Sequence, residues 1–280
     1  MKKNKSILLS TPYILWMLLF TLIPLGVVGY YALTDVETGV FTLKNMENLL
    51  LYMPALWRSI LYSLISAVIC LLIGYPVAYF MAQCKPTTQK FLYMLVMLPM
   101  CMSFLLRTLA WVGLLQDTGI INTFLAKLGF PHGEGEPVVR LIRTPGAVIL
   151  GMVYNYLPYM ILPLYSIIMK IDNRLIEAAE DLGCNGVKVF SKVILPLSMP
   201  GILTGMTMVF VPAVSTFYIS NKMGSTETVL IGDIIERQFK QGDNANMGAA
   251  LSLLLMLLVF ICTGIINRFG GSDEEGSVIV

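Results

Sequence analysis

The sequence predicts an all-α, polytopic membrane protein with six transmembrane helices. Of its 280 residues, 56% are hydrophobic and only 13% are charged, whereas a soluble domain carries about 25% charged residues. Several uncharged stretches reach the roughly 20 apolar residues that a helix needs to cross a bilayer. These stretches lack the alternating polarity of barrel strands. The composition excludes a disordered chain and argues against a soluble globule, and a net charge of +2 without a basic stripe argues against nucleic-acid binding.

The six expected spans form one transmembrane domain over residues 1–280. Their approximate bounds are residues 12–33, 59–83, 91–116, 144–169, 197–219 and 246–267. The third span contains one charge, Arg107, which lies about 24 Å along a helix that rises 1.5 Å per residue. We expect it near the far interface, where it is either an anchor that reaches the headgroups, which we favour, or a functional charge.

The charge distribution predicts that both termini are cytoplasmic. The first apolar stretch is too long for a typical signal peptide, so we expect a retained helix. Lys2, Lys3 and Lys5 precede it, and the segments on the same side hold a small excess of Lys and Arg. With six spans, this orientation makes residues 170–196 a long cytoplasmic loop.

The motifs of common enzymes are missing from the sequence. It contains no GxxxxGK[ST] phosphate loop, no GxSxG nucleophile elbow and no HExxH zinc motif. Its five cysteines form no CxxC pair, and His132 is the single histidine, so we expect no metal site and no catalytic residues. The six spans contain no Asp or Glu, which weakens the case for an ion-coupled carrier.

The cytoplasmic loop predicts a short amphipathic helix, a turn and a second helix that leads into the next span. Asp172 or Asn173 can cap the first helix, and Gly183 suits its end. Apolar residues recur along one face of this helix at i, i+3, i+4 and i+7. They are Leu175, Ala178, Ala179 and Leu182.

Carboxylates flank the small side chains of Ala178 and Ala179. Glu177, Glu180 and Asp181 lie beside this low surface, where a basic protein surface would attract them. The alternative is an interfacial helix on lipid headgroups, which an anionic inner leaflet disfavours for an acidic helix. We favour docking to a protein.

The same loop resembles the EAA loop of ABC importer permeases, whose pattern is EAA-x3-G-x9-I-x-LP. The chain matches it from Glu177 to Pro196, with Val193 in place of Ile. The resemblance implies the MetI-like permease fold, the bacterial inner membrane, and a coupling helix that seats on a separate ABC ATPase dimer. ATP and Mg would then be bound by the ATPase, and no cofactor by this chain. The implied coupling residues are Glu177, Ala178, Ala179, Asp181, Leu182 and Gly183.

Five further segments resemble the PotB-type permeases of spermidine/putrescine importers. The resemblance implies a second, PotC-type permease and an extracytoplasmic polyamine-binding protein as partners. It does not separate spermidine from putrescine. The segments are residues 107–111, 151–158, 161–165, 217–220 and 230–233.

Aromatic side chains are candidates for a cargo path, because a polyamine is a polycation that aromatic faces attract through cation–π contacts. The alternatives are interfacial belts and helix packing. Gly201 and Gly205 form a GxxxG pair that fits either internal packing or contact with the second permease. The candidate path residues are Trp111, Tyr154, Asn155, Tyr156, Tyr159, Phe217 and Tyr218.

Three other functions remain as alternatives. The first is a permease of the same machinery for another small solute, such as an amino acid or iron. The second is an ion-driven carrier or channel. The third is an intramembrane enzyme, for which the spans offer no paired polar constellation.

Overall fold

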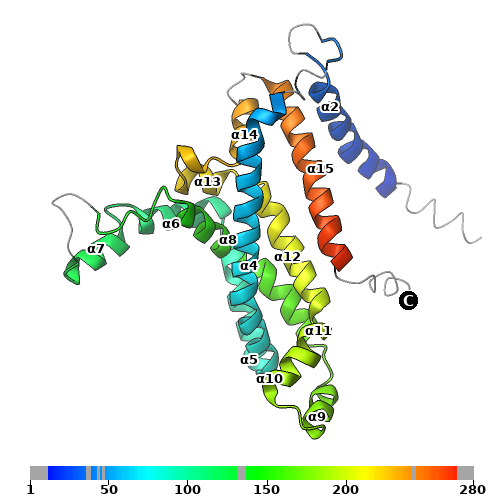
Figure 1. Ribbon diagram of the computed structural model, residues 1–280, viewed down its shortest axis with the longest axis vertical. Coiled ribbons are helices and arrows are strands. Elements are labelled where there is room, and N and C mark those ends of the chain that lie inside the picture. Colours follow the sequence, from blue (N-terminus) through cyan, green and yellow to red (C-terminus); the bar gives the residue numbers. More distant parts are fainter. Residues whose placement is uncertain are drawn as a thin grey trace, which may run out of the picture. The chain divides into compact units, whose positions relative to one another are not determined.

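The computed structural model describes residues 12–35, 39–42, 45, 48–130, 137–240 and 244–269. Within these residues the regular elements are helices, apart from one antiparallel bridge between Thr34 and Phe41 (Figure 1). The predicted all-α class is confirmed. The chain divides into two compact units, residues 1–54 with 234–258 and residues 55–233 with 259–280. Lys2, Lys3, Lys5 and His132 lie outside the described residues.

Five helices in the described part of the chain are long and apolar enough to cross a membrane. A sixth span results if Gly186–Leu197 and Met199–Val214, which are bent by 63° at Ser198, count as one. Two of the expected spans, 91–116 and 197–219, are divided, as described below, and the helix from Leu49 begins ten residues before the expected bound at 59. The five are Pro12–Ala32, Leu49–Gln83, Phe104–Lys127, Pro145–Ile168 and Ala245–Ile266.

The first unit joins the end of α2 (Ile23–Ala32) to the start of α15 (Ala245–Phe269) through one backbone carbonyl. The carbonyl of Thr34 accepts hydrogen bonds from the side-chain amides of Asn45, at 2.9 Å, and Asn246, at 2.7 Å. Both asparagines are buried, so these bonds satisfy polar groups that water does not reach.

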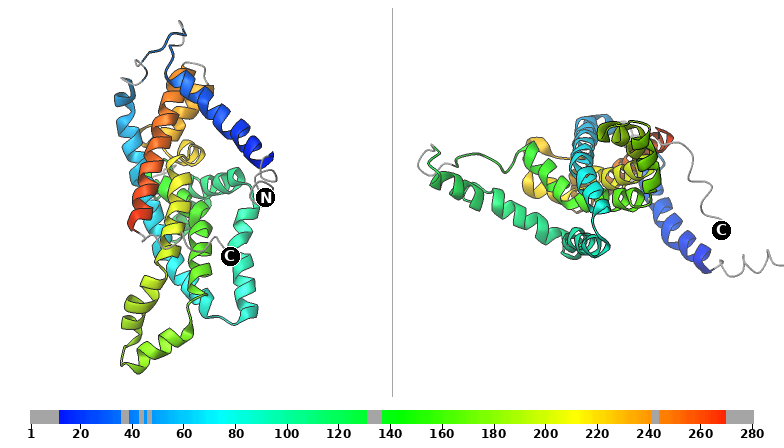
Figure 2. Two further views of the ribbon diagram at one scale, coloured as in Figure 1. Left: turned by 90° about the vertical axis from the view of Figure 1, so that its right-hand side faces the viewer. Right: turned by 90° about the horizontal axis from the view of Figure 1, so that it is seen from below.

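The second unit contains the long helices α4, α8 and α12 together with a series of short helices (Figure 2). α8 is buried along its length, and Val148, Met152, Met160 and Leu164 are fully enclosed. The helices in chain order are α4 (Met53–Gln83), α5 (Pro86–Met97), α6 (Phe104–Leu115), α7 (Ile120–Lys127), α8 (Pro145–Ile168), α9 (Asn173–Asp181), α10 (Gly186–Val189), α11 (Leu195–Leu197), α12 (Met199–Val214) and α13 (Tyr218–Met223); α14 (Ile231–Lys240) begins in this unit.

The expected single helix over residues 91–116 is wrong. The chain forms α5, a 3-10 turn at Leu98–Cys101, and then α6, with extended backbone at Met102 and Ser103 between them. Pro99 explains why α5 ends at Met97, because proline has no backbone N–H and its ring clashes with the preceding turn. Hydropathy does not register this interruption, since the residues on both sides are apolar.

The break changes the place of Arg107. It lies in the first turn of α6, and its side chain is only 6% exposed. The expectation of an interfacial anchor near the far end of a long helix is therefore wrong. The expected span 197–219 is also divided, because α12 ends at Val214 and α13 begins at Tyr218.

Candidate functional site

The loop of residues 170–196 contains the predicted helix, α9, with its ends fixed by local hydrogen bonds. The Asp172 carboxylate accepts from the backbone N–H of Arg174 at 3.0 Å. At the other end Gly183 has a φ of +81°, and the N–H of Cys184 donates to the carbonyl of Ala179 at 3.1 Å. This is the left-handed helix stop that glycine favours. The predicted cap and stop are confirmed.

The outer face of α9 is open. Glu177, Ala178 and Asp181 are exposed, and Leu182 is 86% exposed at the end of the helix. Ala179 is half-buried and turns inward together with Ile176. Sequence reasoning missed Ile176, because it lies outside the apolar repeat.

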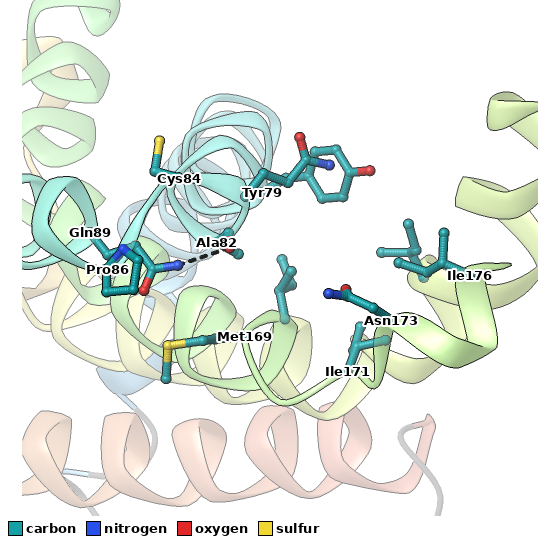
Figure 3. Close-up of a pocket in the computed structure, with 12 residues that line it drawn as sticks. Tyr79, Ala82, Cys84, Pro86, Gln89, Met169, Ile171, Asn173 and Ile176 are labelled. Atoms are coloured by element: carbon teal, nitrogen blue, oxygen red, sulfur yellow. Dashed lines mark hydrogen bonds between the residues drawn. The ribbon is translucent and has the colours of Figure 1, made fainter.

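A cavity of about 460 Å³ lies behind α9 (Figure 3). The ends of α4 and α8 and the starts of α5 and α9 line it, and none of its twelve lining residues is charged. On one side the Gln89 side chain donates to the carbonyl of Ala82 at 3.0 Å. Ile171, Asn173, Ile176 and Ile194 form the side contributed by the loop, so segments before and after α9 both border the cavity. No sequence pattern signals this cavity, since its walls come from separate segments.

The segment after α9 packs onto α4 through aromatic rings. The Phe190 ring lies 5.5 Å from the Tyr75 ring and 6.1 Å from the Tyr79 ring, edge to face in both pairs. The Tyr75 hydroxyl is hydrogen-bonded to the Ser198 hydroxyl at 2.8 Å. α4 and the loop of residues 170–196 are thus joined at a defined set of side chains.

The candidate path residues fall into pairs. The Trp111 ring lies 5.3 Å from the Tyr154 ring, and the Tyr156 and Tyr159 rings are 6.3 Å apart. Tyr218 contacts Phe104, which sequence reasoning did not select, at 6.3 Å. The Lys222 ammonium lies 6.0 Å from the centre of the Tyr218 ring. The side chains of Phe217 and Tyr159 are 42% and 37% exposed.

Two of the candidates are buried in helix packing. Asn155 is 1% exposed, and its amide donates to the carbonyl of Gly151 at 2.9 Å. The Tyr156 hydroxyl donates to the carbonyl of Pro212 at 3.3 Å. In this conformation neither side chain faces an open space, whereas Trp111, Tyr154, Tyr159 and Phe217 retain exposed surface.

Arg107 lies on the same face of α6 as Phe104 and Trp111, between these two aromatic residues. Its buried Nε and Nη1 atoms have no hydrogen-bond acceptor among the described residues. As the one charge within the predicted spans, it was visible in the sequence, but its burial was not.

The structure shows no metal-binding cluster in the residues it describes, because no three His, Cys, Asp or Glu side chains are suitably grouped. All five cysteines are free thiols.

The family model of the binding-protein-dependent transport system inner membrane component matches residues 74–269. The chain belongs to this family. It is an inner-membrane permease of the ABC importer class, as the EAA loop predicted. The matched region includes α9, the cavity and every candidate path residue.

This permease is similar to the spermidine/putrescine transport system permease protein PotB of Haemophilus influenzae, with 40% identity over 257 residues, which cover 88% of each chain. PotB of Escherichia coli is 38% identical over 251 residues, covering 87% of this permease and 90% of the relative. The predicted PotB-type resemblance is confirmed.

A solved bacterial ABC transporter, involved in the import of the acidic polysaccharide alginate, contains a chain of the same fold. Its TM-score is 0.74 at 18% identity, with 96% of both chains covered. This likeness shows the fold alone. The predicted MetI-like permease fold is confirmed.

Proposed function

We propose that this permease is one membrane subunit of an ATP-driven importer of polyamines, spermidine or putrescine. The supporting observation is 40% identity to a PotB permease across 88% of both chains. The fold does not decide the cargo, because a neighbour of the same fold serves an acidic polysaccharide. A permease for another small solute is therefore the second candidate.

In this proposal α9 is the coupling helix of a separate ABC ATPase dimer. The exposed Leu182 enters an apolar part of the ATPase surface, and Glu177 and Asp181 face basic groups around it. ATP and Mg belong to that dimer, and this chain makes and breaks no covalent bond. A second, PotC-type permease completes the membrane part, lipid surrounds it, and an extracytoplasmic polyamine-binding protein delivers the cargo.

The proposed cargo path begins with the contact between Trp111 and Tyr154. Two aromatic faces 5.3 Å apart and partly exposed can hold an ammonium group or a methylene spacer. Phe217, Tyr218 and Tyr159 extend the aromatic surface. Asn155 and Tyr156 join it only if α8 moves during the transport cycle, because both are buried in this conformation.

Spermidine uptake by proteoliposomes tests the proposal. They would contain both permeases and the ATPase, together with the binding protein. We expect ATP-dependent uptake that putrescine inhibits. Trp111→Leu raises the KM for spermidine about tenfold, because a cation–π contact of 1–2 kcal/mol is lost. Trp16→Leu is the matched control, since Trp16 is 58% exposed on the first apolar helix. Uptake of an amino acid or iron instead of spermidine would favour the second candidate.

The same vesicles separate this function from an ion-driven carrier. The permease alone, under a sodium or proton gradient and without the ATPase, transports nothing if the proposal is correct. Uptake under those conditions would contradict it.

We further propose that both termini and α9 face the cytoplasm. A membrane-impermeant maleimide then labels Cys184 in permeabilised cells but not in intact cells. A cysteine placed at Lys222, in a cysteine-free background, is labelled in intact cells. The reverse pattern would remove α9 from the side where ATP is hydrolysed.

A further inference from the structure

The coupling helix α9 is held by two unlike connections. On its N-terminal side, Ile171 and Asn173 border the 460 Å³ cavity shown in Figure 3. On its C-terminal side, three buried residues anchor the segment from Val189 to Ser198, although Ser191, Lys192 and Leu197 are exposed and Ile194 also lines the cavity. Val189 and Ile194 are 3% and 2% exposed, and Ser198 is fully buried. A close-packed segment transmits a displacement, whereas a cavity absorbs one.

Phe190 is the central contact of the C-terminal connection. It starts a π-helical turn at Phe190–Ile194, and its ring meets Tyr75 and Tyr79 edge to face, with both interplanar angles at 84°. Tyr75 and Tyr79 are four residues apart, so they lie on one face of α4. Phe190 therefore packs against one turn of α4, and Tyr79 on that turn also lines the cavity.

The route from α9 along the chain into α12 is bent. α11 ends at Leu197, and α12 starts at Met199 with a change in direction of 63°. A displacement of α9 that is passed along the loop therefore does not point along the axis of α12. The bend itself is fastened to α4, because Ser198 is hydrogen-bonded to the Tyr75 hydroxyl at 2.8 Å. Both contacts lead to α4.

We infer that Phe190 is a positioning residue that passes the movement of α9 to α4. Rotation of α9 by the ATPase compresses or opens the cavity on one side. On the other side, Phe190 moves Tyr75 and Tyr79 and thereby tilts the cytoplasmic end of α4. The inference rests on the proposed function, since it requires an ATPase bound at α9. It assigns to Phe190 a role that differs from docking.

The test measures two quantities in the reconstituted importer: ATP hydrolysis and polyamine uptake. We expect Phe190→Ala to retain the ATPase during purification and to hydrolyse ATP at close to the wild-type rate. Uptake per ATP hydrolysed falls at least fivefold, because α9 still moves but α4 no longer follows. Val187→Ala is the matched control, since Val187 is on the same segment and 75% exposed. Val187→Ala is expected to leave the uptake per ATP hydrolysed unchanged.

Variants of Tyr79, which Phe190 contacts, show whether Phe190→Ala acts by losing the transfer of movement to α4 or by a general loss of packing. Tyr79→Phe keeps the ring and retains the wild-type ratio of uptake to hydrolysis. Tyr79→Ala lowers that ratio, and combining it with Phe190→Ala lowers it no further than Phe190→Ala alone. Additive losses would contradict a shared contact.

Three results bear on the inference in different ways. A wild-type ratio in Phe190→Ala overturns it. Loss of the ATPase from Phe190→Ala during purification also overturns it, because the residue would then serve docking. Absence of ATP-dependent polyamine uptake in the wild-type importer contradicts the proposed function instead. A wild-type control with normal uptake therefore makes the variant result specific to Phe190.

Discussion

Gly205 on α12 lies so close to Met160 on α8 that a Cβ atom at residue 205 would stand 2.6 Å from the methionine Sδ. A Cβ at Gly201 would lie 3.1 Å from the Cβ of Ile167 and 3.3 Å from the carbonyl oxygen of Pro163. The GxxxG pair therefore packs α12 against α8 within this chain. Of the two uses that the sequence allowed for it, the structure shows the internal one.

Gly205→Val is expected to lower the thermal stability of the purified permease. The Met160 side chain can move aside, but the two methyl groups also meet its backbone, whose carbonyl oxygen is only 3.4 Å from the Cβ position. Overpacking of this kind costs about 1–3 kcal/mol. Thermal unfolding in detergent measures the change. Gly264→Val is the control, because no atom lies within 4 Å of its Cβ position; equal losses in both variants would contradict the packing argument.

Gly183→Val is expected to reduce ATP-driven uptake more than Gly183→Asn. The φ of +81° costs an L-residue roughly 1–2 kcal/mol, and asparagine tolerates it better than a β-branched residue. No atom lies within 4 Å of the added Cβ, so backbone strain is the sole direct effect. Uptake and recovery of the ATPase during purification measure the result. If valine behaved as well as glycine, the helix stop would have no part in coupling.

Asp233→Ala is expected to destabilise the start of α14. The buried carboxylate accepts from the N–H of Leu230 at 3.1 Å, and the neighbouring N–H of Ile231 donates to the Ser59 hydroxyl at 2.8 Å. Removing the acceptor leaves a buried donor unsatisfied, at a cost of about 1–3 kcal/mol.

Glu236→Ala provides the comparison for Asp233→Ala on the same helix. Its ion pair with Lys240, at 2.6 Å, is largely exposed on the lysine side. Such a pair contributes about 0.2–1 kcal/mol. Unfolding midpoints of both variants give the two costs. A larger effect at Glu236 would contradict the conclusion that the Asp233 hydrogen bond to Leu230 stabilises the start of α14.

Arg107→Met is expected to stabilise the isolated permease, by about 1–4 kcal/mol. The guanidinium is buried with two nitrogen atoms, Nε and Nη1, that have no acceptor among the described residues, and methionine fills a similar volume without a charge. Arg58→Met has the opposite effect, because the Arg58 side chain donates to the carbonyl of Glu227. Thermal unfolding of both variants decides the matter. A loss of stability in Arg107→Met would mean that the charge has a favourable partner.

The loop of residues 170–196 shows which features could be predicted from the sequence. The Asp172 cap, the Gly183 stop and the open face with Leu182 were all predictable, because they depend on neighbours within a few residues. The inward turn of Ile176 was not, since it depends on the cavity wall that α4 and α5 provide. The aromatic candidates were correct as residue types, but their division into pairs and the burial of Asn155 required the placement of α6 and α8.

The sequence by itself determined the helical class, the apolar stretches, the capped helix of the loop at residues 170–196 and the family, because hydropathy, capping and motif spacing are local properties of the chain. Tertiary structure decided that α5 and α6 are separate helices, that Arg107 is buried, and that Phe190 meets α4. It also decided that Ser198 is bonded to Tyr75, 123 residues away. Such contacts depend on how helices distant in sequence pack, and an apolar helix offers many faces of similar hydropathy from which packing selects one.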